Sequence, residues 1–93
     1  MALGAALDQN QTLGRLLQRL QESRARFAAI REMLPDTLRD QVRPGPLDDA
    51  GWSLLAPSGA AASKLRQLVP ALETRLHEQG WQPTPIRIKV QSA

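Results

Sequence analysis

The sequence contains few side chains that could carry out catalysis. His77 is the only histidine and there is no cysteine, so one chain can form neither a two-histidine metal site nor a thiolate ligand. Asp48 and Asp49 are adjacent carboxylates followed by Ala-Gly, a pattern typical of a hairpin turn. No serine has a candidate base beside it, and no glycine-rich phosphate loop is present. We therefore expect a protein that is not an enzyme, with no metal site and no cofactor.

Charge is distributed unevenly along the chain, whose formal net charge is +3. Residues 35–51 carry four aspartates, whereas the segments on either side are basic. Such a balance suits contact with a polyanion, and it is equally compatible with ordinary solubilising charge. Because only Phe27, Trp52 and Trp81 are aromatic, few side chains are available to stack on nucleic-acid bases. Any binding of single-stranded DNA should rest on phosphates, and should be weak and salt-sensitive.

The length of 93 residues predicts a single domain, residues 1–93, with residues 1–12 as a flexible N-terminal segment. The apolar run near the N-terminus has no basic flank and is too short for a signal peptide. No later stretch approaches the length that spans a bilayer. We therefore expect a cytoplasmic protein with no membrane partner.

A leucine-rich periodicity predicts a first helix that begins near Asn10 or Thr12 and ends at Pro35. Residues 36–42 are expected to form a short second helical piece that turns Leu38 inward. The apolar residues of the first helix recur at steps of three and four, namely Leu13, Leu16, Leu17, Leu20, Phe27, Ile30 and Leu34.

A second long helix is predicted after Ser58, which is a good N-cap, and it should end at the C-capping Gly80. Leu65, Leu68, Leu72 and Leu76 form its apolar stripe. Pro70 lies inside that stripe, where it removes one backbone hydrogen bond. The sequence therefore predicts either two helices or one kinked helix.

Two segments alternate with the period of a strand, residues 52–56 and residues 86–90. A first strand within residues 43–47 must be short or at an edge, because Pro44 and Pro46 lack an N–H. We predict an α+β fold of two layers, in which helices cover one face of a three-stranded sheet. The residues expected in the core are Trp52, Leu54, Ile86, Ile88 and Val90 from the sheet, packed against Leu16, Leu20, Phe27, Leu65, Leu68, Leu72 and Leu76.

The other face of the sheet supplies candidate nucleic-acid-binding residues. Arg87 and Lys89 should face outward there, beside Ser53 and Leu55. Two further candidates lie near the start of the second long helix, whose N-terminal amides favour phosphate. They are Lys64 and Arg66.

The segments 34–42, 52–66 and 86–90 resemble the DciA family, bacterial proteins associated with loading the replicative helicase. The most specific element is a strand ending in Ala56 and Ser58, followed by a helix with Leu-Arg at 65–66 and Pro70 four residues after the arginine. The resemblance implies a K-homology-like domain in helix-strand-strand-helix-helix-strand order. It also implies a replicative DNA helicase as partner.

The chain departs from the family pattern at Ala61, where members often have tryptophan, and at Leu68-Val69-Pro70, where a K-homology domain has Gly-x-x-Gly. Longer members continue into a C-terminal tail, whereas this sequence ends at Ala93. Two functions follow. One is a non-enzymatic module that assists helicase loading and binds single-stranded DNA weakly, with the acidic turn at residues 48–49 as a second contact zone. The other is a small protein–protein interaction domain, homodimeric or not, without nucleic-acid function.

Overall fold

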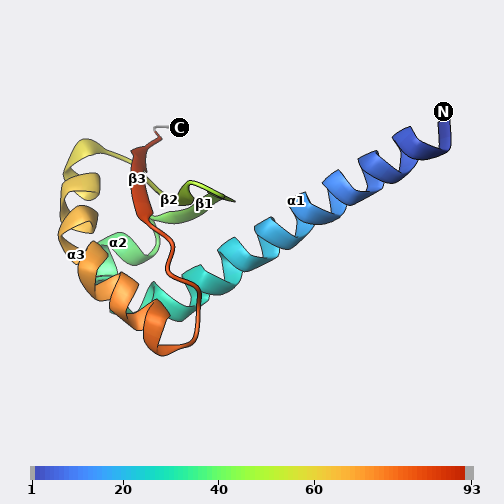
Figure 1. Cartoon of the computed structure of the whole chain (residues 1–93). Helices are drawn as coiled ribbons and strands as arrows, with labels where there is room; N and C mark the ends of the chain where they lie inside the picture. The colour runs from blue at the N-terminus through green and yellow to red at the C-terminus, as the bar shows by residue number, and fades with distance from the viewer. Residues whose placement is uncertain (1, 92–93) are drawn as a thin grey trace.

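A computed structural model describes residues 2–91, with side chains from Thr12 onward. Met1, part of the segment predicted to be flexible, lies outside the described residues. Helix α1 runs far beyond the other elements, which gather around its C-terminal half (Figure 1). The elements in chain order are α1 (Ala2–Ile30), a short 3-10 turn (Arg31–Met33), α2 (Asp36–Arg39), β1 (Arg43–Asp48), β2 (Gly51–Ala56), α3 (Gly59–Glu78) and β3 (Ile86–Val90).

The three strands form one sheet in the order β1-β2-β3, with β1 antiparallel and β3 parallel to β2. Helix α1 packs on β1, and α3 packs on β2 and β3. The helices thus form a second layer on the sheet, and the predicted α+β fold class is confirmed. Helix α1 begins at Ala2 rather than at Asn10 or Thr12, which lie inside it.

The register confirms the predicted division of side chains between the two faces of the sheet. Leu54 pairs with Ile88 on the helix-covered face, as do Trp52 with Ile86 and Ala56 with Val90. The expected burial of Val90 is wrong, because its side chain is 52% exposed near the end of the edge strand β3. Ile86 and Ile88 are half-buried against the core.

Helix α3 has the two caps that the sequence predicts. The Ser58 hydroxyl accepts a hydrogen bond from the Ala61 N–H at 3.2 Å. Gly80 adopts a positive φ of 87°, and its N–H and that of Trp81 donate to the carbonyls of His77 and Leu76, both at 3.0 Å. These bonds satisfy carbonyls that the helix end leaves free. Pro70 lies within a single helix rather than between two, and it is exposed.

The core lies between the sheet and the place where α1 and α3 contact each other. Trp52, Leu54, Leu65 and Leu72 are completely buried, as predicted. Leu16 and Leu20 were expected there and are instead about half exposed, because at this point α1 runs along a groove beside the edge strand β1. The remaining buried apolar residues are Ile30, Leu34, Leu38, Val42, Ala56, Ala61, Ala62 and Leu76.

Gly51 allows the last strand to start close to the hairpin. Its φ is 157°, and a Cβ at this position would lie 2.7 Å from the carbonyl oxygen of Pro85. That carbonyl accepts a hydrogen bond of 2.8 Å from the Trp52 N–H, which begins the pairing of β2 with β3. A side chain at position 51 would therefore separate the two strands.

Candidate functional site

The sheet face opposite the helices carries three exposed cations around one half-buried leucine. Leu55 pairs with Arg43 on β1 and with Lys89 on β3, so these three residues form a row across the sheet. Arg87 lies on the same face, paired with Ser53. We call Arg43, Leu55, Arg87 and Lys89 the basic face; it combines positive charge with a small apolar centre.

Arg43 was not among the residues predicted from the sequence, and a β-bulge explains why. The hairpin pairs Asp48 with Gly51 and Leu47 with Trp52, and counting back from there would place Arg43 opposite Ala56 on the helix-covered face. The register shifts by one residue between Pro44 and Leu47. A shift of one residue moves a side chain to the other face of a sheet, so Arg43 lies opposite Leu55 instead.

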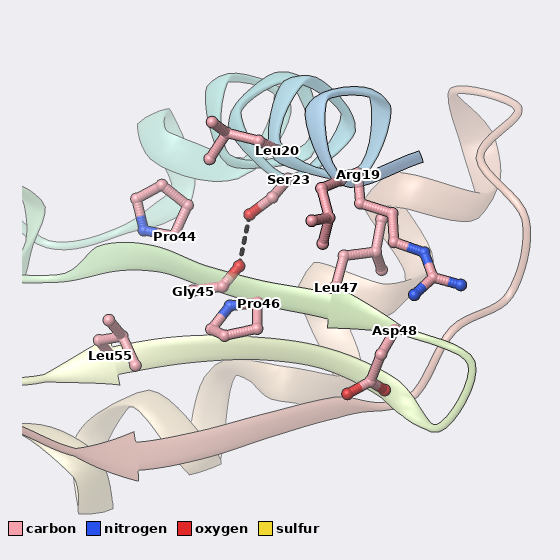
Figure 2. A pocket seen from close by; sticks show the side chains of 10 residues that line it. Arg19, Leu20, Ser23, Pro44, Gly45, Pro46, Leu47, Asp48 and Leu55 are labelled. Carbon is pink, nitrogen blue, oxygen red and sulfur yellow. Dashed lines mark hydrogen bonds between the residues drawn. The ribbon is translucent and has the colours of Figure 1, made fainter. Parts of the chain in front are cut away.

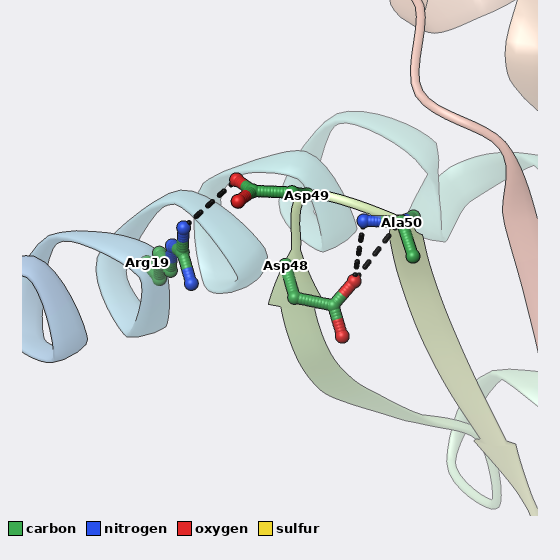
Figure 3. Close-up of polar contacts among 5 residues, drawn as sticks. Arg19, Asp48, Asp49 and Ala50 are labelled. Atoms are coloured by element: carbon green, nitrogen blue, oxygen red, sulfur yellow. Dashed lines mark hydrogen bonds and ion pairs between the residues drawn. The ribbon is translucent and has the colours of Figure 1, made fainter.

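Arg87 is the cation of the basic face that contacts the hairpin turn. Its guanidinium donates to the Ala50 carbonyl at 3.4 Å, beside the hairpin turn. There the Asp48 carboxylate accepts hydrogen bonds from the N–H groups of Ala50 at 2.8 Å and Gly51 at 3.0 Å (Figure 3). The Ala50 N–H bond chiefly lowers the pKa of Asp48 below its usual range, and the charge of Arg87 contributes to this shift. Asp48 is thus a turn residue, as predicted from its type and position.

Lys64 and Arg66 lie apart from the basic face. Both are exposed on α3 and flank the buried Leu65, and α3 packs on the opposite side of the sheet. Lys64 borders a shallow pocket with Ser58 at the start of α3 and Gln41 after α2. The structure therefore separates the four predicted residues into two pairs, one on each layer.

A shallow pocket of about 240 Å³ opens beside Arg43 at one end of the basic face. Leu55 and Pro57 supply apolar walls, and Asp40 and Gln91 supply polar ones. The Asp40 carboxylate is already paired with Arg31 at 3.2 Å. A phosphate at Arg43 would place an attached sugar or base near these apolar walls.

A larger groove of about 500 Å³ lies between α1 and β1 (Figure 2). Leu16 and Leu20 of α1 face Pro44 and Leu47 of β1 across it, and Leu55 reaches it past Gly45. The sequence assigned Leu16 and Leu20 to the core, so it gave no indication of this groove. A helical stripe of apolar residues does not reveal which part of it the same chain covers.

The buried hydroxyl of Ser23 links α1 to the sheet beside this groove. It donates to the Gly45 carbonyl at 2.7 Å and accepts from the Trp52 indole N–H at 2.9 Å. Ser23 is only 2% exposed and Trp52 is completely buried, so the indole N–H has no water as a substitute for this hydroxyl. At the hairpin tip, Arg19 pairs with Asp49 at 3.0 Å (Figure 3). The turn expected as a protein contact zone is thus already bonded to α1.

The part of the chain that the structure describes gives little support for a metal site or for a membrane-spanning helix. There, no three His, Cys, Asp or Glu side chains come together as a metal site. His77, the single histidine, is exposed in the last turn of α3. None of the described helices is both long and apolar enough to cross a membrane.

Comparison with known families gives one result across nearly the whole chain. The family model described as "Dna[CI] antecedent, DciA" matches residues 2–90. The chain therefore belongs to the DciA family, as the resemblance indicated. No curated protein matches the sequence. The family consists of loader-type binding proteins not known as enzymes, and membership implies a role related to helicase loading.

Proposed function

We propose that this chain is a non-enzymatic module that assists loading of the replicative DNA helicase in the cytoplasm and binds single-stranded DNA weakly. The family match over residues 2–90 carries the helicase part of the proposal. The basic face supports the DNA part, because Arg43, Arg87 and Lys89 are exposed together there. The DNA would neutralise cations that the rest of the chain leaves uncovered.

The size of the basic face sets the expected strength of DNA binding. Adjacent strands lie about 5 Å apart, so Arg43 on β1 and Lys89 on β3 are separated by about 10 Å. Three cations within that span can meet about two or three phosphates of one strand, which gives a log–log salt slope of about −2. Trp52 is buried and Trp81 packs against Arg26, with 5.0 Å between guanidinium and ring. Without a free aromatic platform on this face, binding should be indifferent to sequence.

Titration of a labelled oligothymidine at increasing salt tests the DNA part of the proposal. We expect the variant R87E/K89E to bind much more weakly than the parent at low salt, and R43E to weaken binding as well. The variant K64E/R66E is the matched control, since it makes the same change in charge on the helical layer. If R87E/K89E binds as well as the parent, the basic face is not the site. A selective loss in K64E/R66E would assign DNA to the helical layer.

The second candidate function is a protein–protein interaction domain without nucleic-acid function. The exposed leucines of α1 and the groove beside them favour it, because such apolar surface suits a protein partner. Helicase binding that persists while no salt-dependent DNA binding is detected would favour this candidate. DNA binding that responds to R87E/K89E would favour the first.

A further inference from the structure

Helix α1 presents a stripe of four leucines that nothing in the described part of the chain covers. Leu13, Leu16, Leu17 and Leu20 are each about half exposed or more. Their spacing of i, i+3, i+4 and i+7 places them on one side of the helix. Four neighbouring leucines left in water are unfavourable, so this surface indicates a binding site rather than scattered exposure.

The stripe continues into a concave surface. Leu16 and Leu20 form one wall of the groove of about 500 Å³, and Pro44 and Leu47 of β1 form the other (Figure 2). A partner that lies along the stripe would therefore contact α1 and the edge of the sheet together. A flat lipid surface could reach the outer leucines only, because β1 rises beside the inner ones.

An extended peptide cannot readily add to the sheet in this groove. Pro44 and Pro46 remove two N–H donors from β1, which is the edge strand here. The Gly45 carbonyl between them already accepts the Ser23 hydroxyl. Backbone pairing that would hold a new strand is thus largely blocked, whereas a helix needs only apolar side chains in the groove.

The charges beside the stripe indicate what kind of helix fits. From Thr12 to Ile30, α1 carries Arg15, Arg19, Arg24 and Arg26 against the single acid Glu22. Arg24 lies one turn beyond Leu20 on the side of the stripe; it is exposed and makes no ion pair with the side chains described, those of residues 12–91. An acidic residue on the incoming helix would pair with Arg24.

We propose that the leucine stripe and the adjoining groove bind an amphipathic helix of a partner protein, with acidic residues beside its apolar face. The inference goes beyond the proposed function, because it concerns a different surface from the basic face and requires no DNA. It assigns DNA and protein to two surfaces that adjoin at Leu55.

Two synthetic helical peptides with the same leucine stripe test this inference, one with glutamate and one with lysine at the flanking positions. Fluorescence anisotropy with the full chain should show tighter binding of the glutamate peptide. The variant L16S/L20S should weaken that binding by about tenfold or more, since buried apolar anchors dominate such interfaces. V90S is the matched control, because it removes an exposed apolar side chain from β3 and should leave binding unchanged.

Charge exchange gives a second, independent readout. The variant R24E should reverse the preference, so that the lysine peptide binds more tightly than the glutamate peptide, whereas R15E changes the opposite side of α1 and should leave the preference unchanged. Equal binding of both peptides by the parent would overturn the acidic-helix assignment. Two further outcomes would also overturn it: a dimer in sedimentation that L16S/L20S converts to monomer, or binding to phosphatidylglycerol vesicles, with no peptide binding, that L16S/L20S abolishes. No helicase or DNA is present, so the result is separate from the test of the proposed function.

Discussion

The part of α1 whose side chains are described has two halves, residues 13–20 and residues 23–30, with opposite environments. From Ser23 to Ile30 the helix is packed into the core, with Ile30 completely buried. From Leu13 to Leu20 it presents its leucines to water. Both halves carry apolar residues at helical spacing, so the pattern alone predicts the same burial for both. The comparison shows that periodicity identifies an apolar face and leaves open what covers it.

The difference follows from the dimensions of the two layers. A helix of 29 residues is about 44 Å long at 1.5 Å per residue. A sheet of three strands is only about 10 Å wide between its outer strands. Helix α1 therefore extends past the sheet, which agrees with a longest dimension of 52 Å for the whole molecule. Among the side chains that are described, those from Leu13 to Leu20 have only the edge strand β1 beside them.

The largest expected effect is in the buried half. Ile30→Ala should lower the free energy of unfolding by about 2–5 kcal/mol, because it leaves a cavity in a fully packed core. Leu72→Ala, which removes a completely buried side chain of α3, should cost a similar amount. Denaturant unfolding measures both. A loss well below 1 kcal/mol for either variant would contradict the assignment of that residue to the core.

A smaller loss is expected where the two halves meet. Ser23→Ala would leave the Trp52 indole N–H and the Gly45 carbonyl without their partner, at a cost of about 1–3 kcal/mol. Ser63→Ala is the matched control, since Ser63 is exposed on α3 and its loss should change little. Unfolding curves that coincide for S23A and the parent would show that this hydroxyl does not hold α1 on the sheet.

The exposed half should respond in the opposite way to the buried half. Leu17→Ala should change the free energy of unfolding by no more than about 0.5 kcal/mol, because the side chain is already in water. It should nevertheless weaken binding of the glutamate peptide, which anisotropy measures. Destabilisation as large as that of Ile30→Ala would mean that the chain covers this half itself.

The smallest effect concerns the hairpin tip that α1 holds through Arg19. The folded state lowers the pKa of Asp48, so the stabilising effect is complete above the ordinary value of 3.8 and is lost as the pH falls below it toward the lowered pKa. The midpoint temperature of thermal unfolding should therefore fall more steeply for the parent than for Asp48→Ala when the pH is lowered below about 4. Parallel curves for the two proteins would contradict the role of Asp48 in the turn.

Features set by neighbouring residues were predictable from the sequence. The Ser58 cap, the Gly80 cap and the alternation along β2 and β3 depend on local chemistry, and all are confirmed. The missed features depend on distant parts of the chain. Arg43 lies on the basic face because of a β-bulge that no local sequence pattern predicts. Ser23 reads as an ordinary helix residue until β1 and β2 lie beside it.

The candidate site was therefore only partly predictable. Arg87 and Lys89 face away from the helices as the alternation requires, whereas Lys64 and Arg66 lie on the helical layer. Sequence spacing could not show that these two pairs are on different sides, because that depends on how α3 crosses the sheet. The groove beside β1 was missed for the same reason.

Mixing the purified chain with the replicative helicase of the same cell, with and without single-stranded DNA, tests the central claim most directly. Complex formation by sedimentation and loading by an unwinding assay are the two readouts. We predict a complex at low salt and faster or more complete loading of the helicase, with R87E/K89E reducing the DNA-dependent part. The absence of any complex at micromolar concentrations, together with unchanged loading, would contradict the proposed function.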